Sequence, residues 1–333
     1  MAQIVLGIAS SHSPQLSTPA ELWKLHAERD RQNKDLWFRG RSYNFEQLLE
    51  ERQGDHFERQ LDEETWNRRY EECERGVAAL GQTLQEANPD LLVIIGDDQR
   101  ELFLDDGMPT LAVYWGEQAE SNPVPLEELP PSIRPAAWAR GERHEWLPCV
   151  PELGRHIVER MMEEGFDVAQ LTRQPAGRSL GHAFMFVRTR LMKDRIIPMV
   201  PVMINTYFPP NQPTAGRCYA FGQALRRAVE SWDGGHTSTR VGVVASGGLS
   251  HFVIDEDLDG RILDGLKRKD PGGTRPTPEP ADLRHLGDPQ LDRPGRRRRA
   301  PGARRAGLRP HLPERRRHRL WHGVRAMVLM GAA

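Results

Sequence analysis

Short runs of consecutive apolar residues recur along the first 250 residues and predict buried strands. The clearest are Leu91–Ile95 (LLVII), Ile4–Ile8 (IVLGI) and Arg240–Ala245 (RVGVVA), and each is followed at once by small or polar residues. A strand that ends in such residues is typical of a sheet whose loops carry polar side chains. Weaker runs predict further strands at Thr110–Tyr114, Asp167–Leu171 and Ile196–Ile204.

Between these runs, apolar residues recur every three or four positions, which predicts helices that bury one face. In Arg217–Ser231, for example, Phe221, Leu225 and Val229 share a face. Other helices are expected at Leu48–Arg52, Glu64–Cys73, Tyr70–Ala87, Pro151–Glu164 and Asp257–Leu266.

Prolines predict two departures from this regular pattern. Residues 121–150 are rich in proline and are expected to form a long loop. Pro198 and Pro201 interrupt the run 196–204, and because proline cannot donate to a sheet ladder, they favour an irregular or edge strand. The alternation of strands and helices predicts an α/β fold. We expect a single domain over residues 1–270, with a central, mostly buried sheet flanked by helices and a helical insertion at residues 18–70.

Charge divides the chain into two unlike parts. Residues 271–333 contain 15 arginines, no lysine and five acidic residues, a net charge of +10, and are rich in proline and glycine. Residues 1–270 carry 31 basic and 42 acidic residues, a net charge of −11, so the value of −1 for all 333 residues describes neither part. With so few large apolar residues, the tail cannot bury a core of its own.

Two interpretations account for the Arg/Pro/Gly-rich tail. It is expected to be disordered or translated out of frame, because Leu286–Asp292 can be encoded so that a one-base shift gives Ser-Glu-Ile-Arg-Asn-Trp. The coding DNA tests this, since the hypothesis requires a long alternative frame that opens near codon 271. The rival interpretation is a basic arm that binds phosphates and loses affinity as salt rises.

Several other features of the composition narrow the class of protein. No run of about 18 apolar residues exists, which excludes a membrane-spanning helix. Three widely spaced cysteines exclude a disulfide framework and a cysteine-based zinc site. Neither a basic region before the first apolar run nor a nucleic-acid-binding motif is present. A cytoplasmic protein without membrane or nucleic-acid partners is expected.

Polar clusters lie at or near the predicted strand ends. They are Ser10–Pro14, Asp97–Gln99, Leu180–Ala183 and Gly247–His251, and three of them contain a histidine: His12, His182 and His251. Ligands of α/β proteins usually bind beyond the carboxyl ends of strands. A neutral imidazole binds divalent metals, and its ordinary pKa near 6.5 suits proton transfer. The pattern favours a metal or acid–base site over three unrelated loop histidines.

In sequence, the segments GIASSHSPQL, LLVIIGDDQ, PVMINTYFPPNQPTAGRCYAFGQALRRAVES and ASGGLSHF together resemble the class III extradiol ring-cleavage dioxygenases. The resemblance covers roughly residues 1–270. It implies a non-haem Fe(II) cofactor, a small aromatic diol and O₂ as substrates, and assembly as a homo-oligomer or with a small α subunit. It also implies the role of metal ligand for His12, of acid–base catalyst for His251, and of a substrate contact for His182.

Two departures from the family pattern bear on the metal site. Gln99 stands where the family has its second histidine ligand, so that either Gln99 or the neighbouring Asp98 is expected to bind the metal. The glutamate that completes the family's ligand set has no match in the tail. The chain as written is therefore expected to bind iron weakly. A catalytically silent protein and a metal-dependent hydrolase on the same fold remain as alternatives.

Overall fold

Four parallel strands of the main sheet have their carboxyl ends on the same side of the molecule. The structure, a computed structural model, describes residues 1–234, 238–251 and 253–270. Its main sheet has the order β1-β10-β4-β9-β5-β8. The first four strands are mutually parallel, whereas β5 is antiparallel to β9 and parallel to β8. The strands are β1 (Gln3–Ser10), β4 (Leu91–Gly96), β5 (Leu111–Tyr114), β8 (Ala169–Leu171), β9 (Met199–Ile204) and β10 (Arg240–Ser246).

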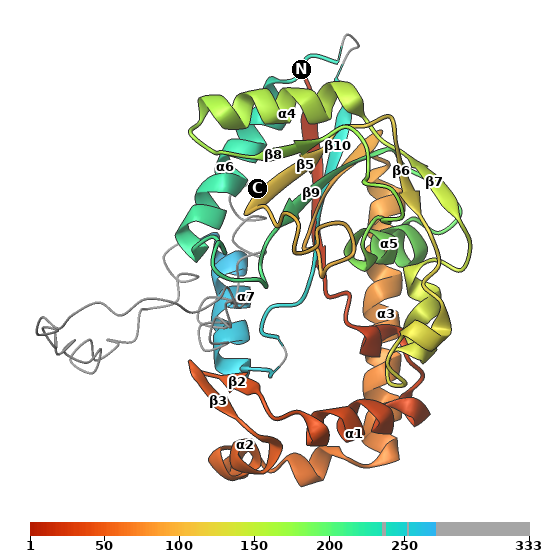
Figure 1. Cartoon of the computed structure of the whole chain (residues 1–333), viewed down its shortest axis with the longest axis vertical. Helices are drawn as coiled ribbons and strands as arrows, with labels where there is room; N and C mark the ends of the chain where they lie inside the picture. The colour runs from red at the N-terminus through yellow and green to blue at the C-terminus, as the bar shows by residue number, and fades with distance from the viewer. Residues whose placement is uncertain (235–237, 252, 271–333) are drawn as a thin grey trace, which may run out of the picture.

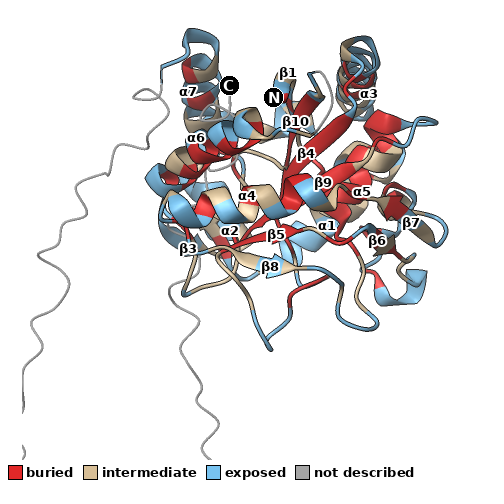
Figure 2. Ribbon diagram, turned by 90° about the horizontal axis from the view of Figure 1, so that it is seen from above, coloured by how far each residue is buried: buried red, intermediate tan, exposed pale blue. Residues whose placement is uncertain are grey.

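Helices cover both faces of this sheet, which confirms the predicted α/β fold (Figures 1 and 2). One face packs against α4 (Pro151–Glu163) and α6 (Ala215–Ser231), through apolar residues such as Ile157 and Phe221. The other face packs against α3 (Glu63–Ala87) and α5 (His182–Phe186), through residues such as Leu84 and Phe184. β4 and β9, in the middle of the sheet, are buried at every position.

The remaining elements lie around this core. The segment expected as an insertion, residues 18–70, contains α1, a two-stranded hairpin, α2 and the start of α3. No helix of the described residues is long and apolar enough to cross a membrane. The tail, with both of its interpretations, lies outside the described residues. The bounds are α1 (Lys24–Gln32), β2 (Leu36–Phe38), β3 (Arg41–Tyr43), α2 (Phe45–Glu51), β6 (Gln118–Ser121), β7 (Glu145–Pro148) and α7 (Glu256–Arg268).

The prediction of an irregular or edge strand at residues 196–204 is wrong. β9 lies between β4 and β5 and pairs with both. Pro201 is tolerated because the ladder with β5 begins at Val202, so the proline stays outside it.

The expected long loop at residues 121–150 is also more ordered than its prolines suggest. It contains a 3₁₀ helix, Arg134–Arg140, and the strand β7, which pairs with β6. Two predicted helices, 64–73 and 70–87, form the single helix α3.

Candidate active site

The site lies where the parallel strands β1, β4 and β10 end. His12 follows β1, Asp97 follows β4, and Ser246 is the last residue of β10. All three are buried, with 6%, 2% and 0% of their surface exposed. The His12 Nε2 atom lies 3.6 Å from the Asp97 Oδ1 atom. The sheet topology thus places an imidazole beside a carboxylate in a dry environment, at the edge where α/β proteins bind their ligands.

Ser246 fixes the protonation pattern of the His12 ring. The Ser246 hydroxyl donates its proton to the Ala183 carbonyl oxygen at 2.6 Å. The His12 Nδ1 atom lies 3.1 Å from the same Ser246 oxygen. A hydroxyl has one proton only, so Ser246 accepts a hydrogen bond from a protonated Nδ1. In the neutral ring the lone pair then resides on Nε2, which faces Asp97. This is the form in which histidine binds a metal.

Gln99 contacts the other oxygen of the same carboxylate. Its side-chain amide donates to Asp97 Oδ2 at 3.3 Å. One oxygen of Asp97 is therefore oriented by Gln99, while the other faces His12. Gln99 thus fixes the orientation of the Asp97 carboxylate that faces His12.

Asp98 has a different environment from Asp97. Its carboxylate accepts hydrogen bonds from the backbone N–H groups of the four residues that follow Gln99, at 2.7 to 3.3 Å. Burial raises the pKa of the Asp98 carboxyl to about 6, although these donors act in the opposite direction. The structure thus makes Asp98 the organiser of the loop after β4. Asp97 is the carboxylate that lies beside His12.

Replacing Asp98 with alanine is expected to lower the free energy of unfolding by about 2–4 kcal/mol, because buried backbone donors lose their acceptor. Urea denaturation measures this loss. Asp105→Ala is the control, since Asp105 is 85% exposed and pairs with Arg100 in the same loop, and it should change stability by less than about 0.5 kcal/mol. Equal effects of the two substitutions would contradict the assigned role of Asp98.

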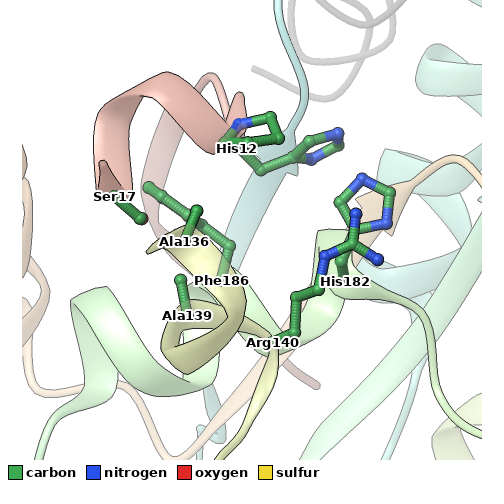
Figure 3. A pocket seen from close by; sticks show the side chains of 8 residues that line it. His12, Ser17, Ala136, Ala139, Arg140, His182 and Phe186 are labelled. Atoms are coloured by element: carbon green, nitrogen blue, oxygen red, sulfur yellow. The ribbon is translucent and has the colours of Figure 1, made fainter. Parts of the chain in front are cut away.

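His182 joins the site from a neighbouring helix. It begins α5, and its ring lies edge-on to the His12 ring with a centroid distance of 4.6 Å. The sequence placed His182 at or near a strand end, but the strand before it, β8, already ends at Leu171. A cavity of about 10 Å³, room for one water molecule, lies between the two histidines, Arg140 and Phe186 (Figure 3).

A buried carboxylate orients the His182 ring. Both Glu101 oxygens lie 2.8 Å from His182 Nδ1, and they also accept the His182 backbone N–H at 3.1 Å. Arg140 donates to Glu101 at 3.3 Å. Burial alone would raise the pKa of Glu101, but the adjacent His182 and Arg140 outweigh it and hold that pKa below its ordinary value. Glu101 is ionised at neutral pH, holds the proton on Nδ1 and leaves Nε2 of His182 to face the cavity side.

His251 follows β10 in the loop that begins with Gly247. Its Nδ1 atom lies 3.0 Å from the Tyr207 hydroxyl, and the two rings meet edge-on. A side chain placed on Gly248 would come within 3.5 Å of the Ser11 hydroxyl and 3.8 Å of the His251 ring. The loops after β1, β9 and β10 therefore converge, and they place His251 next to the segment that carries His12.

His12 and Asp97 suit a divalent cation. Ligands bound to one metal at about 2.1 Å each lie roughly 3.0–3.6 Å apart, and the 3.6 Å between Nε2 and Oδ1 matches this spacing. Within the described residues, no group of three or more His, Cys, Asp or Glu side chains is placed to hold a metal. The glutamate that completes the family's ligand set would come from the tail, where the sequence has no match for it, and the tail lies outside the described residues. Among the described residues, the donors beside one another are one imidazole and one carboxylate.

The sequence predicted no role for four residues of this site: Asp97, Glu101, Arg140 and Tyr207. Asp97 belongs to one of the predicted polar clusters but received no role, because the family's ligand position falls on Gln99. Glu101 and Arg140 come from irregular segments far apart in the chain, and no local pattern marks them. Tyr207 lies three residues after β9, within a segment that resembles the family, and that position was its signal.

A family model and several relatives match this chain. The model described as the catalytic LigB subunit of aromatic ring-opening dioxygenase matches residues 60–263. A gallate dioxygenase of Pseudomonas putida is 36% identical over 124 residues, 34% of this chain and 34% of the relative. The 2,3-dihydroxyphenylpropionate/2,3-dihydroxicinnamic acid 1,2-dioxygenase of Comamonas testosteroni is 24% identical over 178 residues, 54% of this chain and 48% of the relative. That of Cupriavidus necator is 28% identical over 213 residues, 63% of this chain and 58% of the relative.

The fold and the strand-end site define an α/β protein with a buried histidine–carboxylate pair. Because the family match covers more than half of the chain, this protein belongs to the family of catalytic subunits of aromatic ring-opening dioxygenases. The resemblance to the extradiol enzymes is thereby confirmed. The chain spans between about a third and three fifths of the length of these relatives.

Proposed function

We propose that this protein cleaves the ring of a catecholic aromatic compound with O₂, in an extradiol reaction that depends on Fe(II). The observation that carries the proposal is the pair formed by His12 and Asp97, whose Nε2 and Oδ1 atoms lie 3.6 Å apart at the strand ends of a ring-opening dioxygenase domain. The names of the relatives support an aromatic diol as substrate, since two of them act on 2,3-dihydroxyphenylpropionate.

His12 and Asp97 would hold the metal, and Gln99 would orient Asp97. A bound Fe(II) supplies the chemistry that lets O₂ react with an aromatic ring, and imidazole and carboxylate are the ligands of non-haem Fe(II) oxygenases. Weak iron binding was expected because the chain lacks the family's glutamate ligand. Asp97 supplies a carboxylate that this expectation did not take into account. We therefore propose that the pair binds Fe(II) even though the glutamate of the family's ligand set has no match in the tail.

The other two histidines act on the substrate in this proposal. The bond between Tyr207 and Nδ1 of His251 leaves Nε2 of that ring for proton transfer, and His251 removes the proton of a diol hydroxyl. His182, which Glu101 holds with its ring 4.6 Å from the ring of His12, contacts the substrate. Burial of the site excludes bulk water, which strengthens each of these electrostatic contacts.

Oxygen consumption by the Fe(II)-loaded protein with a panel of catechols tests the proposal. An uptake of one O₂ per substrate, together with the absorbance of a ring-opened product, is the expected result. A protein that binds Fe(II) but consumes no O₂ with any catechol would instead be a silent member of the family. Hydrolysis of an amide or of a ring-opened compound with Zn²⁺ bound would identify a hydrolase.

Replacing Glu101 with glutamine is expected to lower kcat/KM by about 10–100-fold, as is typical when a carboxylate that orients a site histidine is removed. Steady-state kinetics at neutral pH measure the loss. Glu120→Gln is a matched control, because Glu120 forms a similar pair with His144 at 3.0 Å on the surface. If both substitutions changed kcat/KM equally, Glu101 would have no special role in the site.

The contribution of Glu101 to the stability of the folded protein depends on pH. Since the pKa of Glu101 is lowered in the folded protein, its stabilising contribution is fully present above its unfolded pKa of about 4.5 and is lost as the pH falls below that value.

A further inference from the structure

The hairpin of the N-terminal segment reaches the loop that carries His251. Strands β2 and β3 lie beside the N-terminal end of α7, away from the main sheet (Figure 1). α7 begins at Glu256, five residues after His251. The contact is polar, and two arginines of the segment 39–52 form it. Two segments about 200 residues apart in the sequence are therefore in contact close to a site histidine.

Arg39 binds the carboxylate that caps α7. Its Nε and one terminal nitrogen donate to the two oxygens of Asp255 at 2.9 and 3.0 Å, and the same terminal nitrogen donates to Asp257 at 2.8 Å. The Asp255 side chain is only 8% exposed. Such a two-point contact fixes orientation as well as distance.

Arg52 adds a second attachment to the same turn. It donates to the Ile254 carbonyl oxygen at 2.8 Å and to Glu256 at 2.8 Å. Its guanidinium lies over the Phe38 ring, 4.8 Å from the ring centroid. Arg39 and Arg52 together thus hold four consecutive residues, 254 to 257.

Hydrogen bonds continue from Asp255 to the residue beside His251. The Asp255 backbone N–H donates to the Ser250 hydroxyl at 2.9 Å, and that hydroxyl donates to Asp259 at 2.7 Å. The Ser250 backbone N–H also donates to Asp259, at 2.9 Å. Ser250 is buried. An unbroken set of contacts therefore runs from Arg39 through Asp255 and Ser250 to the backbone of His251.

The backbone of Arg39 indicates that its side chain has a specific role. Arg39 and Gly40 form the two-residue turn between β2 and β3, with φ angles of 45° and 83°. A hairpin turn with two positive φ angles favours Asn, Asp or Gly at its first position. Arginine is disfavoured there, and a disfavoured conformation persists where surrounding contacts hold it. Here those contacts are the bonds to Asp255 and Asp257.

We propose that Arg39 is a positioning residue: through Asp255 and Ser250 it fixes the loop that presents His251 to the substrate. The catalytic part of this inference rests on the proposed function, whereas the clamp on the loop does not. The segment 18–70 thereby acquires a role in the site, although none of its residues need touch the substrate.

Arg39→Asn is the informative variant, because asparagine suits the turn and removes only the guanidinium. We expect kcat to fall about tenfold while KM changes less than about threefold. Arg39→Lys should recover part of the loss, since one charged bond to Asp255 can re-form. Arg41→Ala, an exposed residue of the same hairpin, should keep the kcat of the unchanged protein. A kcat that Arg39→Asn leaves unchanged would overturn the positioning role.

Amide hydrogen exchange of residues 249–251 and 253–255 provides a readout that does not need activity. We expect exchange about tenfold faster in Arg39→Asn and unchanged in Arg41→Ala, because the loop loses its clamp. Unchanged exchange in Arg39→Asn would overturn the clamp, whatever the kinetics. If the unchanged protein consumes no O₂ with any catechol, the proposed function and the positioning role both fail, and faster exchange would still establish the clamp.

Discussion

Replacing His12 with alanine is expected to lower the affinity for Fe(II) by at least about a hundredfold and to abolish O₂ consumption with catechols. The reason lies in its tautomer. Ser246 holds the proton on Nδ1, and the lone pair on Nε2 faces Asp97. Loss of an outer partner of a metal ligand already costs 10–100-fold in affinity, so the loss of the ligand itself should cost at least as much. Anaerobic titration with Fe(II), followed by oxygen uptake, measures both effects.

His144→Ala is the control for this experiment. His144 is 47% exposed and pairs with Glu120 on the surface, so its removal should leave both iron affinity and O₂ consumption unchanged. A His12→Ala protein that bound Fe(II) as tightly as the unchanged protein would show that the metal lies elsewhere.

Replacing His251 with alanine should lower kcat by about 10²–10⁴-fold, the usual contribution of a general acid–base group, and leave Fe(II) affinity nearly unchanged. The two histidines are thereby distinguished, since His12→Ala loses the metal and His251→Ala retains it. Tyr207→Phe removes the hydroxyl that lies 3.0 Å from His251 Nδ1 and should lower kcat by a smaller factor, about tenfold. If His251→Ala lost the metal as well, His251 would be a ligand rather than a proton acceptor.

The fold was predictable because its strands are short, apolar and bounded by polar residues. Leu91–Ile95 and Arg240–Ala245 became neighbouring central strands, β4 and β10. The errors occurred where tertiary structure overrides local preference. Pro201 is accepted in a central strand because β5 pairs only beyond it. The prolines of residues 121–150 did not prevent a paired strand there, because β7 pairs with β6, the strand that ends where this segment begins.

The candidate site was predictable only in part, since a motif identifies a loop and not the direction of its side chains. His12 and His182 meet as expected, at 4.6 Å. The sequence does not show, however, which of Asp97 and Asp98 faces His12. The turn after β4 decides this, because Asp98 accepts the backbone N–H groups of residues 100 to 103 and Asp97 is left to face His12. Glu101 reaches His182, and Arg140 reaches Glu101, only once the chain has folded.

The comparison of Asp97→Asn with Asp98→Asn tests the proposed metal site most directly. Both variants remove one negative charge from adjacent residues, and circular dichroism selects preparations that are folded. Fe(II) binding is then followed anaerobically, with the electron paramagnetic resonance signal of the nitric oxide adduct as the readout. We predict one Fe(II) per chain in the unchanged protein and in Asp98→Asn, and at least about a tenfold loss of affinity in Asp97→Asn. Retention of Fe(II) in Asp97→Asn together with its loss in Asp98→Asn would contradict the site described here.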